Sequence, residues 1–349
     1  MDRGQADAGH HRLKKLMAGA ALLAALPSAA FAERPDEEKG VLSLAVENDS
    51  LSSGADRNYT SGIKLAYVSP SEGVPDWLRG AGGFTRAISG DAPDFWGMAI
   101  GQSIFTPEDI NAIPAPADQH PYAGWLYMQI MVGVEEAPRA NRAPHFLDTY
   151  EVEFGIVGPS AMGEEAQRGI HQALGAPDPQ GWDSQLNNEF AFAVSFDRRW
   201  RAQRVFADFL GGIEGDLTPS AGVTLGTLRT EARVGLAARI GQRIDSDYGP
   251  PRVRPSLASV EHFDGGPLSW SLFAGVQGRA VARNLFLDGN TFEDSASVER
   301  TPLVADFQTG FTISAGDWRL AYTYVWRTEE FETQPTRQDF GAVALSWRL

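Results

Sequence analysis

The last nine residues of the chain, Gly341-Ala-Val-Ala-Leu-Ser-Trp-Arg-Leu349, alternate apolar side chains with small or polar ones up to the final position. Successive side chains of a β-strand point to opposite faces, so Val343, Leu345, Trp347 and Leu349 share one face. A secreted soluble β-sandwich also alternates, but it rarely ends in a strand that turns Trp and Leu outward. The C-terminus therefore favours a sheet whose outer face contacts lipid.

The same alternation recurs along the chain in segments of about ten residues, separated by turn-rich or polar stretches. Twelve such segments lie near residues 41–48, 59–69, 94–105, 124–136, 149–157, 188–199, 204–216, 222–238, 268–282, 303–315, 318–330 and 339–349. In lipid every backbone N–H and C=O must be paired, so an open sheet is excluded. The pattern predicts an all-β fold, a transmembrane antiparallel up-and-down β-barrel of about 12 strands, with the soluble β-sandwich as the alternative.

The N-terminus predicts export, which together with the alternating strands implies insertion in the bacterial outer membrane. Arg12, Lys14 and Lys15 precede an apolar run over residues 16–26, and small residues lead to Ala30-Phe31-Ala32. The run is about half the ~20 residues that a transmembrane helix needs. We expect a cleaved signal peptide over residues 1–32 and a single outer-membrane β-barrel domain over residues 33–349.

Composition excludes several classes of function. The 349 residues carry a formal net charge of −15 and include no cysteine. The absence of cysteine excludes disulfides, a thiolate nucleophile, Cys-ligated zinc and iron–sulfur clusters. The acidic balance argues against a partner of nucleic acid.

If twelve strands cross the membrane and both termini lie in the periplasm, the connection from the first strand to the second, from the third to the fourth, and so on, lies outside the cell. The outward loops expected on this basis are 49–58, 106–123, 158–187, 217–221, 283–302 and 331–338. Only the loop 158–187 has a helical pattern, with Ser160 as a candidate N-cap, Glu164 and Glu165 in the first turn, and Gly175 as the stop. The stretches 70–93 and 239–267 are long for periplasmic turns, which are usually short.

Six histidines occur, and topology separates them. Four fall in the signal peptide or on periplasmic turns: His10, His11, His145 and His262. Of the two on outward loops, His120 and His171, the second lies on the predicted helix with Gln167 one turn earlier and Glu164 two turns earlier. An imidazole is the usual general base near neutral pH, so His171 is a candidate base, with a solvated helix histidine as the alternative. Ser160 is not in a nucleophile elbow, because no glycine follows at the required place.

Oxygen-bearing side chains gather where the first strand ends and the second begins. Glu47-Asn48-Asp49-Ser50 precedes the turn, and Asn58-Tyr59-Thr60-Ser61-Gly62 follows it. A hairpin brings the two ends together, so Asn48, Asp49, Asp56 and Thr60 can converge. Such a cluster suits a hard cation such as Ca²⁺, although the same residues are also ordinary in hairpin turns.

These residues also resemble a known family, the outer-membrane lipid A 3'-O-deacylases. Residues 47–49 with 56–62 resemble its N-terminal signature. Further blocks resemble the family in order along the chain: 121–127 (Pro-Tyr-Ala-Gly-Trp-Leu-Tyr), 155–163 with Gln167, His171 and 181–186, and 284–290 (Asn-Leu-Phe-Leu-Asp-Gly-Asn). Two positions depart from the family pattern: Ser61 stands where the family usually has Asn, and Gln119-His120 where it usually has Asp-Arg. The lost arginine removes a bidentate contact to a phosphate or an oxyanion.

The resemblance implies a calcium-dependent hydrolase that removes the 3'-linked acyloxyacyl group from lipid A of lipopolysaccharide in the outer leaflet. It implies that Asn48 and Asp49 match the family's active-site pair and that His171 matches its base on a loop helix. The implied protein is a membrane-embedded carboxylic ester hydrolase, expected to be a monomer.

Without a serine elbow or a thiol, an ester hydrolase must activate water. We expect His171 to take the proton of the water, and a cation near Asn48 and Asp49 to stabilise the oxyanion. Thr60 and Gln167 complete the candidate catalytic residues, and Asn48, Asp49 and Asp56 are the candidate metal ligands. An outer-membrane phospholipase and a non-enzymatic barrel or pore are the alternatives.

Overall fold

The computed structural model describes residues 39–49, 58–71, 73–80, 82–136, 146–200, 203–209, 212–244, 263 and 266–349. The predicted signal peptide and its cleavage site lie outside the described residues, as do Asp56, His145 and His262. Among the described helices none has the length and apolar character needed to cross a membrane.

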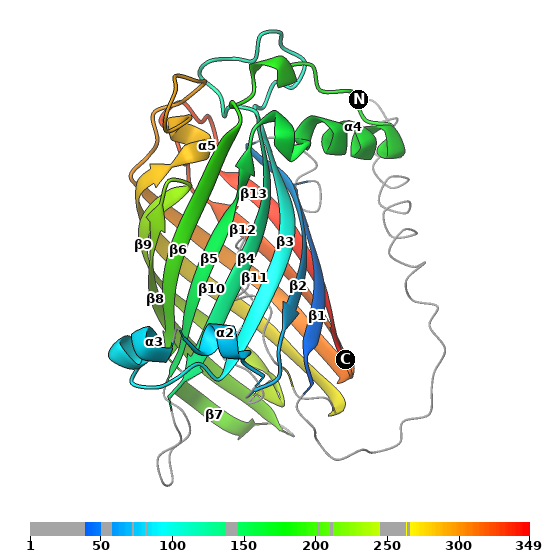
Figure 1. Cartoon of the computed structure of the whole chain (residues 1–349). Coiled ribbons are helices and arrows are strands. Elements are labelled where there is room, and N and C mark those ends of the chain that lie inside the picture. The colour runs from blue at the N-terminus through cyan, green and yellow to red at the C-terminus, as the bar shows by residue number, and fades with distance from the viewer. Residues whose placement is uncertain are drawn as a thin grey trace, which may run out of the picture.

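Within the described residues, twelve antiparallel strands close into a barrel (Figure 1). They are β1 (Val41–Asn48), β2 (Asn58–Val68), β3 (Phe95–Thr106), β4 (Ala123–Glu135), β5 (Phe146–Val157), β6 (Glu189–Trp200), β8 (Ile213–Gly226), β9 (Arg229–Gln242), β10 (Gly266–Asn284), β11 (Leu303–Gly316), β12 (Trp318–Arg327) and β13 (Gln338–Arg348). Each pairs with its sequence neighbours, and the ring closes where β1 pairs with β13 and where β6 pairs with β8. The barrel predicted from the alternation is therefore confirmed.

We call the end of the barrel at which β1 ends the outer end, and the opposite end the periplasmic end. A short extra strand, β7 (Gln203–Phe209), pairs with the first half of β8 at the periplasmic end. Beyond this half β8 changes neighbour and pairs with β6, beginning at Ser220.

The predicted strands at 204–216 and 222–238 are wrong, and so is the outward loop 217–221 between them. Residues 217–221 lie inside β8, and the outward turn is formed by residues 227 and 228. Pro219 lies inside this strand, although proline normally interrupts a strand. It stands between Leu217, the last residue of β8 that pairs with β7, and Ser220, the first that pairs with β6. Its missing N–H therefore leaves no gap in the pairing of β8 with β7 or with β6.

The outward connection 158–188 contains the helix that the sequence predicted. This helix, α4 (Gly163–Leu174), ends as expected at Gly175, whose φ of 69° is left-handed. The expected cap is wrong: Ser160 lies in the 3₁₀ turn η2 (Pro159–Ala161), and Met162 takes the N-cap position with φ 56°.

The expectation that only one loop is helical is also wrong. The long connection 69–94 at the periplasmic end contains α2 (Asp76–Arg79) and α3 (Gly82–Ser89). The outward connection after β10 contains α5 (Leu285–Asp288), and the 3₁₀ turn η3 (Trp182–Ser184) follows α4. The length of the stretch 70–93 is thus explained by helices rather than by an error in strand order.

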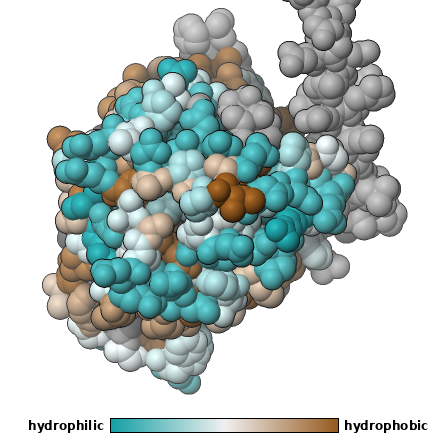
Figure 2. All heavy atoms as spheres, turned by 90° about the horizontal axis from the view of Figure 1, so that it is seen from above, coloured by the Kyte–Doolittle hydropathy of each residue, from teal (hydrophilic) through white to brown (hydrophobic). Residues whose placement is uncertain are grey.

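Strand register separates an apolar outer face from a polar interior. Ile63 and Ile100 are about half exposed on the outer face, as expected for side chains that contact lipid. Inside, buried charges pair across the strands, as Arg233 does with Asp197 and Arg239 with Asp216. Viewed from the outer end, the barrel is covered largely by hydrophilic residues (Figure 2).

Candidate active site

The connection 158–188 packs α4 against the outside of the barrel wall at the outer end. The amide of Gln102 on β3 donates to the carbonyl of Ala161 over 2.7 Å. Gly163, the first residue of α4, lies so close to Gly124 of β4 that a Cβ built on it would stand 2.9 Å from the Gly124 Cα. Ile104, which strand register places on the outer face, is buried with Trp182 and packs against Ala166 of α4. The helix is therefore fixed to the wall at its N-terminal half.

His171 lies on the buried side of α4 and has a defined tautomer. The residue is 3% exposed, and Nδ1 lies 2.5 Å from the carbonyl oxygen of Pro177. A carbonyl oxygen can only accept, so Nδ1 carries a proton, and in the neutral ring the lone pair is on Nε2. In the neutral form of the ring, Nε2 is the nitrogen that can accept a proton.

Gln167, one turn before His171, is oriented by its neighbour Trp182. The indole N–H of Trp182 donates to Oε1 of Gln167 over 2.8 Å, which distinguishes the amide oxygen from the amide nitrogen. The Gln167 side chain is buried, and within the described residues its Nε2 has no hydrogen-bond partner. Two N–H donors therefore lie on the same helix face as the candidate base. Glu164, on the first turn, instead forms an ion pair with Arg168.

The second group of predicted residues lies at the ends of β1 and β2. Asn48 pairs with Ser61 across the hairpin, and its amide donates to the carbonyl of Thr60 over 3.1 Å. Thr60 is the extra residue of a bulge against β3, and its hydroxyl shares a hydrogen bond of 2.6 Å with the Thr106 hydroxyl. Asp49, which follows directly, is buried. The structure thus brings Asn48, Asp49 and Thr60 together, as the sequence predicted.

Both groups lie at the outer end of the barrel. β1 and β5 run in the same direction, so Asn48 at the end of β1 and α4 after the end of β5 are at the same end, as Figure 1 shows. The topology therefore places the candidate base and the candidate oxygen ligands on one rim.

His120, the other outward histidine, lies inside the mouth of the barrel. Its ring stacks on Phe105, with 5.4 Å between ring centroids, and Nδ1 lies 2.8 Å from the Pro121 carbonyl oxygen. Burial lowers the pKa of His120, against the opposing effects of the Pro121 hydrogen bond and of Glu330. It borders a small internal cavity of about 60 Å³.

The charged network around this cavity was not found from the sequence. Arg279 forms ion pairs with Glu231, Asp306 and Glu330 at 3.2 to 3.4 Å. Burial alone would raise the pKa of Glu330, but the guanidinium groups of Arg327 and Arg279 outweigh it and lower the pKa. Alternation along β9, β10 and β11 places these charges inward, but the pairing depends on register between strands.

The oxygen-bearing side chains at the rim are of the type that binds a hard cation, but they are fewer than such a cation needs. Asn48 and Asp49 supply an amide and a carboxylate, whereas Ca²⁺ takes about six to eight oxygen ligands. In the part of the chain that the structure describes, no group of three or more His, Asp and Glu side chains is arranged to hold a metal ion. Asp56, the third predicted ligand, lies outside the described residues.

Comparison with known proteins gives a family match over most of the chain. The family model described as outer membrane protein LpxR matches residues 16–349. The solved structure of LpxR from Salmonella typhimurium has a TM-score of 0.71 and 20% sequence identity, and covers 88% of this chain and 100% of that chain. The β domain of the Bordetella autotransporter BrkA covers 90% of this chain and 100% of that chain, with a TM-score of 0.42 and 9% identity. No curated protein sequence matches the chain.

Proposed function

Because the chain belongs to the LpxR family of outer membrane proteins, we propose that it is a hydrolase that removes the 3'-linked acyloxyacyl group from lipid A. The protein lies in the bacterial outer membrane. The observation that carries the proposal is His171, which α4 holds at the outer end with its Nδ1 proton donated to Pro177. The outer end of the barrel is the level of the leaflet in which lipid A resides.

His171 acts as the general base toward a water molecule. Nε2 accepts a proton from the water as its oxygen attacks the ester carbonyl carbon, and a tetrahedral oxyanion forms. When the oxyanion collapses, the bond to the 3'-oxygen of the sugar breaks and the imidazolium returns the proton to that oxygen. The products are the free acyloxyacyl acid and a 3'-hydroxyl group. Gln167, whose amide is oriented by Trp182, supplies N–H donors beside this base and orients the attacking water.

Asn48 and Asp49 are the residues that would hold Ca²⁺. When bound, this cation would stabilise the negative charge that develops on the carbonyl oxygen. Thr60 acts through Asn48. The backbone carbonyl of Thr60 accepts a hydrogen bond from the side-chain amide of Asn48, so the amide oxygen of Asn48 points away from Thr60. Thr60 is therefore a positioning residue.

The test compares two histidines at the same end of the barrel. We expect His171→Gln to lower release of the 3' acyloxyacyl chain from purified lipid A by about 10²–10⁴-fold, the usual contribution of a positioned base. His120→Ala, which alters the barrel mouth, should cost far less. Heat-modifiable gel mobility shows that both variants are folded. An active His171→Gln variant together with an inactive His120→Ala variant would contradict the assignment.

The same assay addresses the alternative of a phospholipase. Purified protein is given lipid A and, separately, phosphatidylethanolamine, and released fatty acids are identified by mass spectrometry. Release from lipid A alone supports the proposal, while release from the glycerophospholipid alone assigns the site to the other substrate class.

A further inference from the structure

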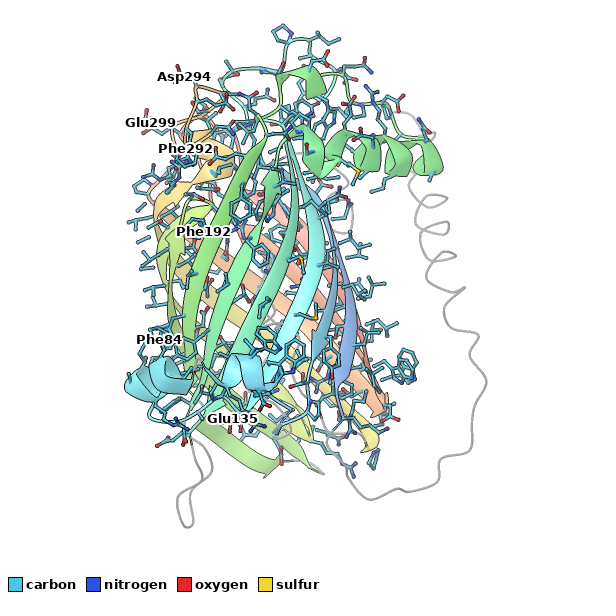
Figure 3. All side chains as sticks on the ribbon, viewed as in Figure 1. Phe84, Glu135, Phe192, Phe292, Asp294 and Glu299 are labelled. Atoms are coloured by element: carbon cyan, nitrogen blue, oxygen red, sulfur yellow. The ribbon has the colours of Figure 1, made fainter. Side chains whose placement is uncertain are left out.

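The helices α2 and α3 lie against the outside of the barrel wall at the periplasmic end (Figure 1). They belong to the connection between β2 and β3, far from α4. Figure 3 labels Phe84 on α3, at the periphery of the molecule. The proposed hydrolase site makes no use of this segment.

The C-terminal residue of α3 covers an ion pair on the outer face of the wall. Arg198 of β6 donates to both carboxylate oxygens of Asp148 on β5, over 2.7 and 2.6 Å. Asp148 and Tyr150 alternate with inward residues and lie on the same face as Val152, which is exposed on the outside. Ser89 of α3 donates its hydroxyl to Asp148 and shares a hydrogen bond with the Tyr150 hydroxyl, and Asp148 is completely buried. Without α3, a carboxylate and a guanidinium would face lipid, which is unfavourable.

Apolar side chains are exposed on α2 and α3, next to the exposed charged residues Asp76, Arg79 and Arg86. Phe84 and Ile88 are four residues apart on α3, so they share a face, and they are 61% and 47% exposed. Trp77 of α2 is 65% exposed. Thr85, by contrast, is buried, and its hydroxyl donates to the carbonyl of Asp91.

The exposed rings continue an aromatic row on the barrel wall. Trp77 contacts Trp96 of β3, with 6.4 Å between ring centroids, and Trp96 contacts Tyr67 of β2 at 5.9 Å. Phe84 contacts Tyr150 at 5.6 Å. Rows of Trp and Tyr on the outer face of a barrel mark the level at which hydrocarbon meets headgroups.

From this continuity we propose that α2 and α3 form a membrane-interface segment in the periplasmic leaflet. The segment takes the place of lipid over the Asp148–Arg198 pair and inserts Trp77, Phe84 and Ile88 among the phospholipids of that leaflet. The occupant of the exposed apolar face is thus the phospholipid surface itself. The inference requires the outer-membrane barrel but is independent of the hydrolase activity.

The absence of cysteine from the chain allows a direct test. The single-cysteine variants Phe84→Cys and Ile88→Cys are labelled with a polarity-sensitive fluorophore and reconstituted in phosphatidylethanolamine–phosphatidylglycerol vesicles. Asp294→Cys, in an exposed outward loop, is the control. Heat-modifiable mobility selects folded protein, and having two positions on α3 keeps the test available if one variant does not fold.

We expect the labels at Phe84 and Ile88 to show blue-shifted emission and to be quenched by lipids that carry a doxyl group near the headgroup. The label at Asp294 should be quenched by iodide in the water instead. Quenching of the α3 labels by iodide to the extent seen at Asp294 would overturn the proposal. The proposal would also be overturned if the α3 cysteines of two copies formed disulfide cross-links and the labels were not quenched by lipid, because the apolar face would then bind a second copy.

Discussion

Replacing Gly163 by alanine should displace the helix that holds the candidate base. A Cβ built on Gly163 would stand 2.8 Å from Cη2 of Trp182 and 2.9 Å from Cα of Gly124, which is backbone of β4. Ordinary contact begins at 3.4 Å, so the start of α4 must move from the wall by about half an ångström. The Gly124 backbone cannot yield, because it belongs to a strand paired on both sides.

The same helix supplies a matched control in Gly169. A Cβ built there meets nothing within 4 Å, and the residue is exposed in the middle of α4. Because glycine disfavours a helix by about 0.8–1 kcal/mol relative to alanine, Gly169→Ala should stabilise α4 slightly. The two substitutions are chemically identical and differ only in their surroundings.

We expect Gly163→Ala to reduce lipid A deacylation by up to about 10²-fold, since a displacement near 1 Å of a catalytic group can cost that much. Gly169→Ala should keep full activity. The measurement is the initial rate of acyloxyacyl release with folded protein quantified by gel mobility. Equal rates for the two variants would refute the reasoning that contact at Gly163 sets the position of His171.

Three further outcomes are expected. Burial lowers the pKa of His120 below 6.5, so the unfolded chain binds more protons and stability should fall as pH drops below about 6.5. His120→Asn should remove this part of the pH dependence of the heat-modification midpoint. The loss of stability that comes from Glu330, whose pKa is also lowered, begins only below about pH 4.5. Ser160→Ala should change the midpoint and the activity little, by less than about 0.5 kcal/mol in stability, because Met162 and not Ser160 caps α4. Chelation of Ca²⁺ should abolish deacylation and leave the barrel folded, and full activity in excess chelator would exclude a catalytic cation.

Strand existence was predictable because alternation is a local property of the sequence. The end of α4 was predictable for the same reason, since Gly175 alone permits the left-handed stop at low cost. The start of α4 was not, because Met162 adopts a left-handed φ that its own side chain disfavours. Packing of the neighbouring Gly163 against Gly124 supplies the reason, and this contact joins residues far apart in the sequence.

The helix α3 and the lumen charges were missed because both depend on long-range contacts. The sequence of α3 begins with two glycines and has no capping residue, so its local preference for helix is weak. It is held by Ser89, which bonds to Asp148 on β5. Likewise, Arg279 meets Glu231 and Asp306 only because the register of β10 with β9 and β11 places them together.

For the acylated substrate proposed here, the surroundings of the two outward histidines favour the outside of the wall over the lumen. The cavity beside His120 has about 60 Å³, room for only a few water molecules, and charged side chains surround it. Phe286 of α5 stacks on Phe105 with 4.1 Å between ring centroids and packs across the barrel mouth. An acyl chain bound there would have to displace paired charges from a polar interior, which is unfavourable. His171 instead lies on a helix packed against the apolar outer face, where the acyl chains of a lipid in the outer leaflet already reside, so only the ester has to reach the base.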